Sequence, residues 1–128
     1  MKQIEVVAAI IVKENTVFVA QRRDGEFRNL WEFPGGKIEK GENAVQALHR
    51  EIQEELDITV TIESLFQEVH YAYPTFYLHL QCFLCTIGSE KITLKEHISS
   101  RWLTRDQLDE VTWLPANKNI ISSLKSYL

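Results

Sequence analysis

The sequence predicts one α+β domain, an α/β/α sandwich in which a mixed β-sheet lies between helices. Three observations support this prediction. Strand-like apolar runs bounded by turn residues occupy much of the chain, whereas helical periodicity is pronounced in only two segments. Hairpin-like spacing joins some runs, while a helix separates others. The length of 128 residues suits a single domain spanning residues 1–128.

The strands are predicted from runs rich in β-branched, aliphatic and aromatic residues. They are residues 4–12, 16–22, a brief segment around Trp31 and Phe33, and residues 58–62, 76–87 and 100–104. A short polar turn separates the first two runs, which therefore predict a hairpin. Residues 34–42 contain a proline and three glycines, so no regular structure is expected there.

The first helix is expected to begin after Asn43, because Gln46 follows three residues later at capping-box spacing. Its buried stripe is predicted from apolar residues at helical intervals: Val45, Leu48, Ile52 and Leu56. Asp57 is expected to end this helix.

A last helix is expected from Asn117 to Tyr127, shortly after Pro115. Its inner face is predicted to contain Ile120, Ile121 and Leu124. Between the last strand and this helix, Thr104 and Gln107 are spaced to cap a short helix over residues 105–110.

Composition excludes several classes of function. The formal net charge of −4 argues against binding a nucleic acid polymer, which favours a basic face. No segment approaches the roughly 18 consecutive apolar residues of a membrane-spanning helix. No cleavage signal follows the apolar run near the N-terminus, so we expect a cytoplasmic protein that does not bind membranes.

The two cysteines, Cys82 and Cys85, have the spacing of some metal and redox motifs. Both fall within a predicted strand, where residues three apart point to opposite faces. They could not share a metal there. We expect two half-buried thiols.

The helix that follows Asn43 places Glu51, Glu54 and Glu55 on one face. Like charges at these spacings cost roughly 0.2–0.5 kcal/mol per pair, so a positive group is expected among them. Oxygen-only clusters select hard cations, above all Mg²⁺ or Mn²⁺, often together with substrate phosphates. The sequence therefore suggests a divalent-metal site for a phosphorylated small molecule. The alternative is a solvated acidic helix face.

Residues 36–58, GKIEKGENAVQALHREIQEELDI, favour the metal site. Their spacing resembles the Nudix box, the signature of the Nudix hydrolases, at every position but one. Asp57 stands where the family usually has Gly, a change at the helix terminus that alters no carboxylate. The resemblance implies the Nudix fold and Mg²⁺, with Mn²⁺ as the alternative cofactor.

The resemblance also implies roles for individual box residues. Glu51, Glu54 and Glu55 are the expected catalytic and metal-binding residues. Gly36 is expected to approach a metal through its backbone carbonyl. Glu42 and Arg50 are expected to form a structural pair that ties the loop to the helix.

Further segments resemble the MutT-like branch of the family: IEVVAAII near the start, AQRR at 20–23, LWEFPGGK at 30–37 and LPAN at 114–117. That branch implies hydrolysis of a nucleoside triphosphate to a nucleoside monophosphate and pyrophosphate. We favour 8-oxo-dGTP as substrate, with CTP or a modified pyrimidine triphosphate as the alternative. A non-catalytic nucleotide-binding module and an ADP-ribose or dinucleoside polyphosphate hydrolase are the other possibilities.

Four residues outside the box complete the expected site. Arg23 is expected to contact phosphate or sugar, unless it is only a surface charge at a strand end. Glu96 is expected to reach the metal, whereas the adjacent His97 is expected at the surface. Phe33 is expected in the core or in the wall of the substrate-binding pocket, where it could stack on the base. The amide of Asn117 is expected either to read the base or to cap the last helix. The sequence leaves monomer and weak dimer open.

Overall fold

The computed structural model describes every residue from Met1 to Leu128. Its strands are β1 (Lys2–Lys13), β2 (Thr16–Arg22), β3 (Trp31–Glu32), β4 (Gly35–Lys37), β5 (Thr61–Ala72), β6 (Phe76–Thr86) and β7 (His97–Thr104). Its helices are α1 (Ala44–Leu56), the 3₁₀ helix η1 (Arg105–Glu110) and α2 (Pro115–Tyr127). None of the helices has the length and apolar character needed to cross a bilayer.

The sheet is mixed, as predicted, and it divides beside β1. One edge of β1 pairs in parallel with β6, and β5 joins β6 as an antiparallel hairpin. The other edge pairs with β4 between Val6 and Ala8, and with β2 only at Val12 and Lys13. β2 in turn pairs with β3 and β7. Two branches of the sheet, one that begins with β4 and one that begins with β2, therefore pair with the same edge of β1 at different positions along that strand.

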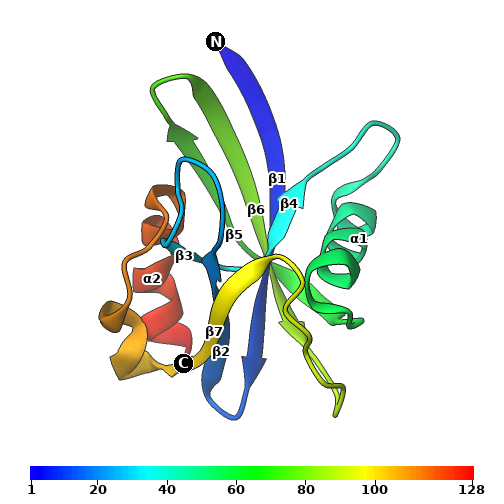
Figure 1. The fold of residues 1–128 in the computed structure, drawn as a ribbon, viewed down its shortest axis with the longest axis vertical. Helices are drawn as coiled ribbons and strands as arrows, with labels where there is room; N and C mark the ends of the chain where they lie inside the picture. Colours follow the sequence, from blue (N-terminus) through cyan, green and yellow to red (C-terminus); the bar gives the residue numbers. More distant parts are fainter.

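Helices cover both faces of this sheet, which confirms the predicted sandwich. Figure 1 shows α1 and α2 on opposite sides of the central strands. Alternation along β1 divides the core: Ala8 belongs to the apolar cluster that includes α2, and Val7 to the cluster that includes α1. Cys82 and Cys85 follow the same rule on β6, because they lie in different clusters. Both are free thiols, but they are fully buried and not half-buried as expected.

Most of the predicted elements are confirmed. The hairpin of β1 and β2 forms, and Asn43 caps α1 in a capping box with Gln46. Asp57 ends α1 with a left-handed backbone conformation, φ 56° and ψ 41°. Thr104 and Gln107 form the capping box of η1.

Two strand predictions were wrong in extent. Gly35–Lys37, expected to be irregular, form β4 against β1. This pairing needs glycine, because a Cβ at Gly35 would overlap the backbone carbonyl of Val7. The strand expected at residues 58–62 instead begins at Thr61 and extends to Ala72, where it pairs with β6 across two irregularities in register. Pairing partners set these limits, and local sequence does not encode them.

The buried face of α1 is rotated relative to the prediction. Leu48, Ile52 and Leu56 are fully buried, but Val45 is 43% exposed. Glu55, by contrast, is only 5% exposed. The helix therefore turns part of its carboxylate face toward the interior of the protein.

Candidate functional site

Two cavities adjoin where the sheet divides. The smaller has a volume of about 210 Å³ and is lined by charged and polar residues and one glycine, among them Glu32, Glu51, Glu55 and Glu96. The larger has a volume of about 400 Å³ and is lined mainly by apolar side chains. Arg22, Glu32 and Gly35 line both. These spaces are termed the charged cavity and the apolar cavity.

The three glutamates of α1 occupy different environments. Glu55 is buried and Glu51 is half-buried, and both line the charged cavity. The side chain of Glu54 is 54% exposed and does not line that cavity. The helix therefore brings two of its three expected metal-binding glutamates into the lining of the cavity, whereas the third is exposed to solvent.

Arg50 is the positive group among these carboxylates. Its Nε donates to Glu42 Oε2 at 2.6 Å, and its Nη1 donates to Glu51 Oε1 at 2.7 Å and to Glu54 Oε2 at 3.3 Å. Its Nη2 donates to the backbone carbonyl of Lys37 at 2.9 Å. The arginine thus joins the loop after β4 to α1, and its guanidinium lowers the pKa of Glu42.

Glu55 lacks such compensation. Burial, and next the negative charges of Glu32, Glu51 and Glu96, raise the pKa of Glu55 to about 10. Its Oε2 is buried without a hydrogen-bond partner. A buried carboxylate with an unpaired oxygen and acidic neighbours is an environment that a cation would stabilise.

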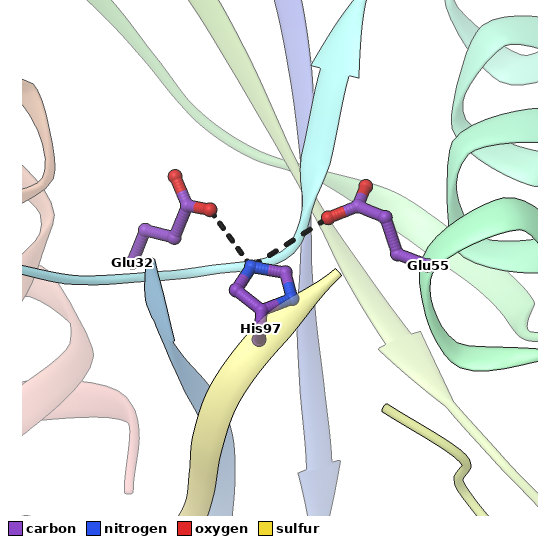
Figure 2. Close-up of side chains that lie close together, drawn as sticks. All are labelled: Glu32, Glu55 and His97. Atoms are coloured by element: carbon purple, nitrogen blue, oxygen red, sulfur yellow. Dashed lines mark hydrogen bonds and ion pairs between the residues drawn. The ribbon is translucent and has the colours of Figure 1, made fainter. Parts of the chain in front are cut away.

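Glu32 and His97 are functional candidates that sequence reasoning did not identify. The prediction that His97 lies at the surface was wrong: it is 8% exposed, because β7 begins at this residue and places its ring between two elements. Its Nε2 lies 2.9 Å from Glu32 Oε2 and 3.7 Å from Glu55 Oε1 (Figure 2). One signal was available, because Glu32 interrupts an aromatic strand between Trp31 and Phe33.

Gly36 lies in β4 directly against the carboxyl of Glu51. A Cβ at this position would overlap the carboxyl group of Glu51, so any other residue would displace that side chain. The backbone at this position therefore lies very close to a carboxylate. The structure therefore places the backbone of Gly36 beside Glu51, one of the glutamates with which it was expected to act, although Gly36 lines the apolar cavity and not the charged one.

Two arginines follow each other at the end of β2. Arg23, the one singled out from the sequence, lines the charged cavity; its Nε donates to Asp24 Oδ2 at 3.1 Å. Arg22 lines both cavities and donates from Nη1 to Glu32 Oε1 at 2.9 Å. Arg22 was missed because adjacent residues of one type give no local sign of which faces inward. Glu96 is exposed and lines the charged cavity from the loop before β7.

The apolar cavity is closed on one side by the start of α2. Asn117 is buried within the first turn of that helix, whose N-cap is Leu114. The alternative that Asn117 caps the helix was therefore wrong, because the helix begins two residues earlier with Pro115 at its first position. Instead, Asn117 Oδ1 accepts a hydrogen bond from the backbone N–H of Phe33 at 3.0 Å.

Aromatic side chains form other walls of this cavity. The ring of Phe33 stacks on Trp113 with centroids 5.0 Å apart. Tyr73 stacks on Phe76 at 4.7 Å, and its hydroxyl oxygen accepts a hydrogen bond from the backbone N–H of Ala116 at 3.1 Å. The tip of the β5–β6 hairpin is thereby attached to the start of α2, beside Asn117.

Comparison with known proteins is consistent with this geometry. A family model described as NUDIX domain matches residues 1–124. An 8-oxo-dGTP diphosphatase of Escherichia coli (strain K12) is 36% identical, with 98% of each chain covered. A CTP pyrophosphohydrolase of the same organism is 33% identical, over 91% of this chain and 87% of the other.

Two solved structures are also similar to this chain in sequence and in fold. The solution structure of DNA mismatch repair protein MutT, described as a Nudix hydrolase, from methicillin-resistant Staphylococcus aureus 252 is 35% identical, with a TM-score of 0.79 and full coverage of both chains. The solution structure of the E. coli ORF135 protein is 32% identical, with a TM-score of 0.83 over 99% of this chain and 89% of that one. The chain belongs to the Nudix hydrolase family.

Proposed function

We propose that this protein is a Mg²⁺-dependent nucleoside triphosphate pyrophosphohydrolase that converts 8-oxo-dGTP to the monophosphate and pyrophosphate. The observation that carries the proposal is the junction of the two cavities. A carboxylate-lined space suits metal-bound phosphates, and an adjoining aromatic space that contains one buried amide suits a base. The names of relatives, including an 8-oxo-dGTP diphosphatase, point to the same substrate.

The charged cavity fits a hard divalent cation. Its oxygen donors, and the unpaired buried Oε2 of Glu55 in particular, match the ligand preference of Mg²⁺ or Mn²⁺. The proposed ligands are the carboxylates Glu51, Glu54, Glu55 and Glu96 and the backbone carbonyl of Gly36. When bound, the metal would activate the attacking water and neutralise phosphate oxygens.

The protein's own residues have three tasks in this reaction. Arg22 and Arg23 border the charged cavity and would bind phosphate oxygens, for which the guanidinium fork is suited. Arg50 and Glu42 hold the loop after β4 on α1 and so position the carboxylates. The glutamates of α1 supply the negative charge and are the candidates to accept a proton from water.

Asn117 would read the base. Its Oδ1 is held by the N–H of Phe33, which fixes the amide and leaves the Nδ2 group as a donor without a partner in the protein. This donor matches the six-position oxygen of an oxopurine. The second lone pair of Oδ1 can accept from the N7 hydrogen that 8-oxoguanine has and guanine lacks. Recognition of such a polar group can discriminate by roughly 10⁴–10⁵.

CTP or a modified pyrimidine triphosphate is the second candidate. Glu32 lines both cavities, and a carboxylate can accept from the amino group of cytosine. A relative named as a CTP pyrophosphohydrolase supports this alternative. A non-catalytic binding module is disfavoured, because the carboxylates of the box are all present and two of them line the cavity.

The deciding experiment is a hydrolysis panel with Mg²⁺, comparing 8-oxo-dGTP, dGTP, CTP, 5-methyl-dCTP and ADP-ribose, with the products identified by phosphorus NMR. We expect the highest kcat/KM for 8-oxo-dGTP, with pyrophosphate as product. Preferred turnover of CTP would select the second candidate. Orthophosphate as primary product, or full turnover in EDTA, would contradict the proposed reaction.

We further propose that residues 1–128 act as one domain, because the two apolar clusters lie on the two faces of one sheet. The cytoplasm is the proposed location, in keeping with the two free cysteines. Gel filtration with light scattering would distinguish the monomer from the weak dimer.

A further inference from the structure

Glu32, Glu55 and His97 form a cluster of metal-binding residue types that the proposed magnesium site uses only in part. They come from β3, α1 and β7, and each is at most 9% exposed. One ligand atom from each lies within 4.8 Å of the others. Figure 2 shows the two carboxylates pointing toward the same ring nitrogen from opposite sides. The proposed magnesium ligands include neither Glu32 nor His97.

Hydrogen bonding within the protein does not satisfy this cluster. A single N–H on His97 Nε2 can serve Glu32 at 2.9 Å but not also Glu55 at 3.7 Å. Glu55 Oε2 and His97 Nδ1 are both buried with no partner. Buried polar atoms without partners are costly, so a purely structural network would be expected to pair them. The unpaired Glu55 also lines the charged cavity, where an ion can enter.

The spacing of the three groups suits a common cation. Ligands at right angles around an ion are about 3 Å apart when each bond is about 2.1 Å long. The separation of His97 Nε2 from Glu32 Oε2 is 2.9 Å, and its separation from Glu55 Oε1 is 3.7 Å. Small side-chain rotations would therefore bring the three ligand atoms onto one ion.

The donor set also indicates which ions would bind. Mg²⁺ prefers oxygen ligands only, whereas imidazole combined with carboxylates suits divalent first-row transition ions. We propose that Glu32, Glu55 and His97 form a subsite for such an ion, adjacent to the oxygen-only magnesium ligands and sharing Glu55 with them. The subsite rests on the proposed metal-dependent function of the same cavity.

Mn²⁺ is the probe for this subsite, because its paramagnetism reports its ligands directly. Metal-free protein would be titrated with Mn²⁺, and electron spin-echo modulation would be recorded for the bound ion. We expect modulation from a directly coordinated imidazole nitrogen. His97→Gln should remove it and weaken Mn²⁺ binding by at least about tenfold, while Mg²⁺ affinity, measured by competition, changes less.

The matched control is His49→Gln, which removes an exposed imidazole from α1 itself. It should keep both the nitrogen modulation and the Mn²⁺ affinity. If His97→Gln fails to fold, a chain with His49, His70 and His79 all changed to Gln retains His97 as its only imidazole, and its spectrum decides the question.

Bound Mn²⁺ without a coordinated nitrogen in the wild-type protein would overturn the subsite. So would a His97→Gln variant that binds Mn²⁺ unchanged. In either case, continued hydrolysis with Mg²⁺ would leave the proposed function intact. Absence of any divalent cation binding would instead contradict both proposals.

Discussion

The charged cavity and the apolar cavity differ in how far apart in the sequence their key residues lie. In the charged cavity, Glu51 and Glu55 come from one helix, and Arg50 of the same helix contacts the carboxylates around it. In the apolar cavity, Phe33, Tyr73 and Asn117 come from segments far apart in the sequence. Helical spacing thus brings two carboxylates into the first region, whereas packing between the sheet and α2 assembles the second.

This difference indicates which property of the enzyme a substitution in each cavity should change. Residues of the charged cavity depend on one another electrostatically, since burial and acidic neighbours raise the pKa of Glu55. Residues of the apolar cavity depend on one another sterically and through single hydrogen bonds, such as that from the Phe33 N–H to Asn117. Changes in the charged cavity should therefore affect the chemical step, and changes in the apolar cavity should affect the choice of base.

The largest expected effect is that of Glu54→Gln on turnover. The substitution keeps the shape of the side chain but removes one proposed metal-binding charge, so kcat should fall by at least about 100-fold, equivalent to roughly 2.7 kcal/mol. Because Glu54 is exposed and bonded only to Arg50, the melting temperature should change little. Steady-state kinetics and a thermal melt test both points.

Glu14→Gln, in the turn between β1 and β2, is the matched control and should leave kcat unchanged. A collapse of thermal stability in Glu54→Gln, with normal metal dependence, would instead identify Glu54 as a structural residue.

The next effect concerns base selection by Asn117→Ala. Loss of the amide should lower kcat/KM for 8-oxo-dGTP much more than for dGTP, because only the oxidised base supplies the N7 hydrogen. The buried Phe33 N–H would also lose its acceptor, at a cost of about 1–3 kcal/mol in the free energy of unfolding. An equal loss of kcat/KM with both nucleotides would show that Asn117 only positions Phe33 and does not recognise the base.

A third prediction concerns the pH dependence of stability without metal. Unfolded Glu55 releases its proton near its ordinary pKa of 4.5, whereas the folded protein retains it up to about 10. Between these values the unfolded chain binds fewer protons, so the free energy of unfolding falls as pH rises. The melting temperature in EDTA should therefore decrease from pH 5 to pH 9.

Glu55→Gln should flatten this decrease. His79, whose pKa is raised by its hydrogen bond to Glu5, also loses stabilisation as pH rises, but it does so equally in both proteins. Identical profiles of melting temperature against pH for the wild type and Glu55→Gln would show that Glu55 does not cause the decrease.

The smallest expected effect is that of Tyr73→Phe. The substitution removes the acceptor for the Ala116 N–H, which should lower the free energy of unfolding by about 1 kcal/mol, and it keeps the aromatic ring in the cavity wall. Because this bond attaches the hairpin tip beside Asn117, KM for 8-oxo-dGTP should rise while kcat is nearly constant. Tyr71→Phe, whose ring packs on Tyr73 with centroids 4.7 Å apart, is the control and should leave KM unchanged. Matching KM values for the two variants would exclude a positioning role for the Tyr73 hydroxyl.

The fold class, the limits and caps of α1, and the carboxylates on one face of that helix could all be predicted from the sequence. These features are local: a capping box spans four residues, and the spacing of Glu51, Glu54 and Glu55 places them on one face wherever the helix packs. The mixed sheet followed from the order of strands and helices along the chain.

Which of these side chains are buried, and which residues they contact, depends on the tertiary structure. The packing of α1 buries Glu55 and exposes Val45, and two strands bring Glu32 and His97 close to Glu55. The tertiary structure also placed Asn117 inside α2 rather than at its cap, facing Phe33. Burial and unpaired polar atoms depend on contacts between residues distant in sequence, and these contacts have no periodic or local pattern from which to predict them.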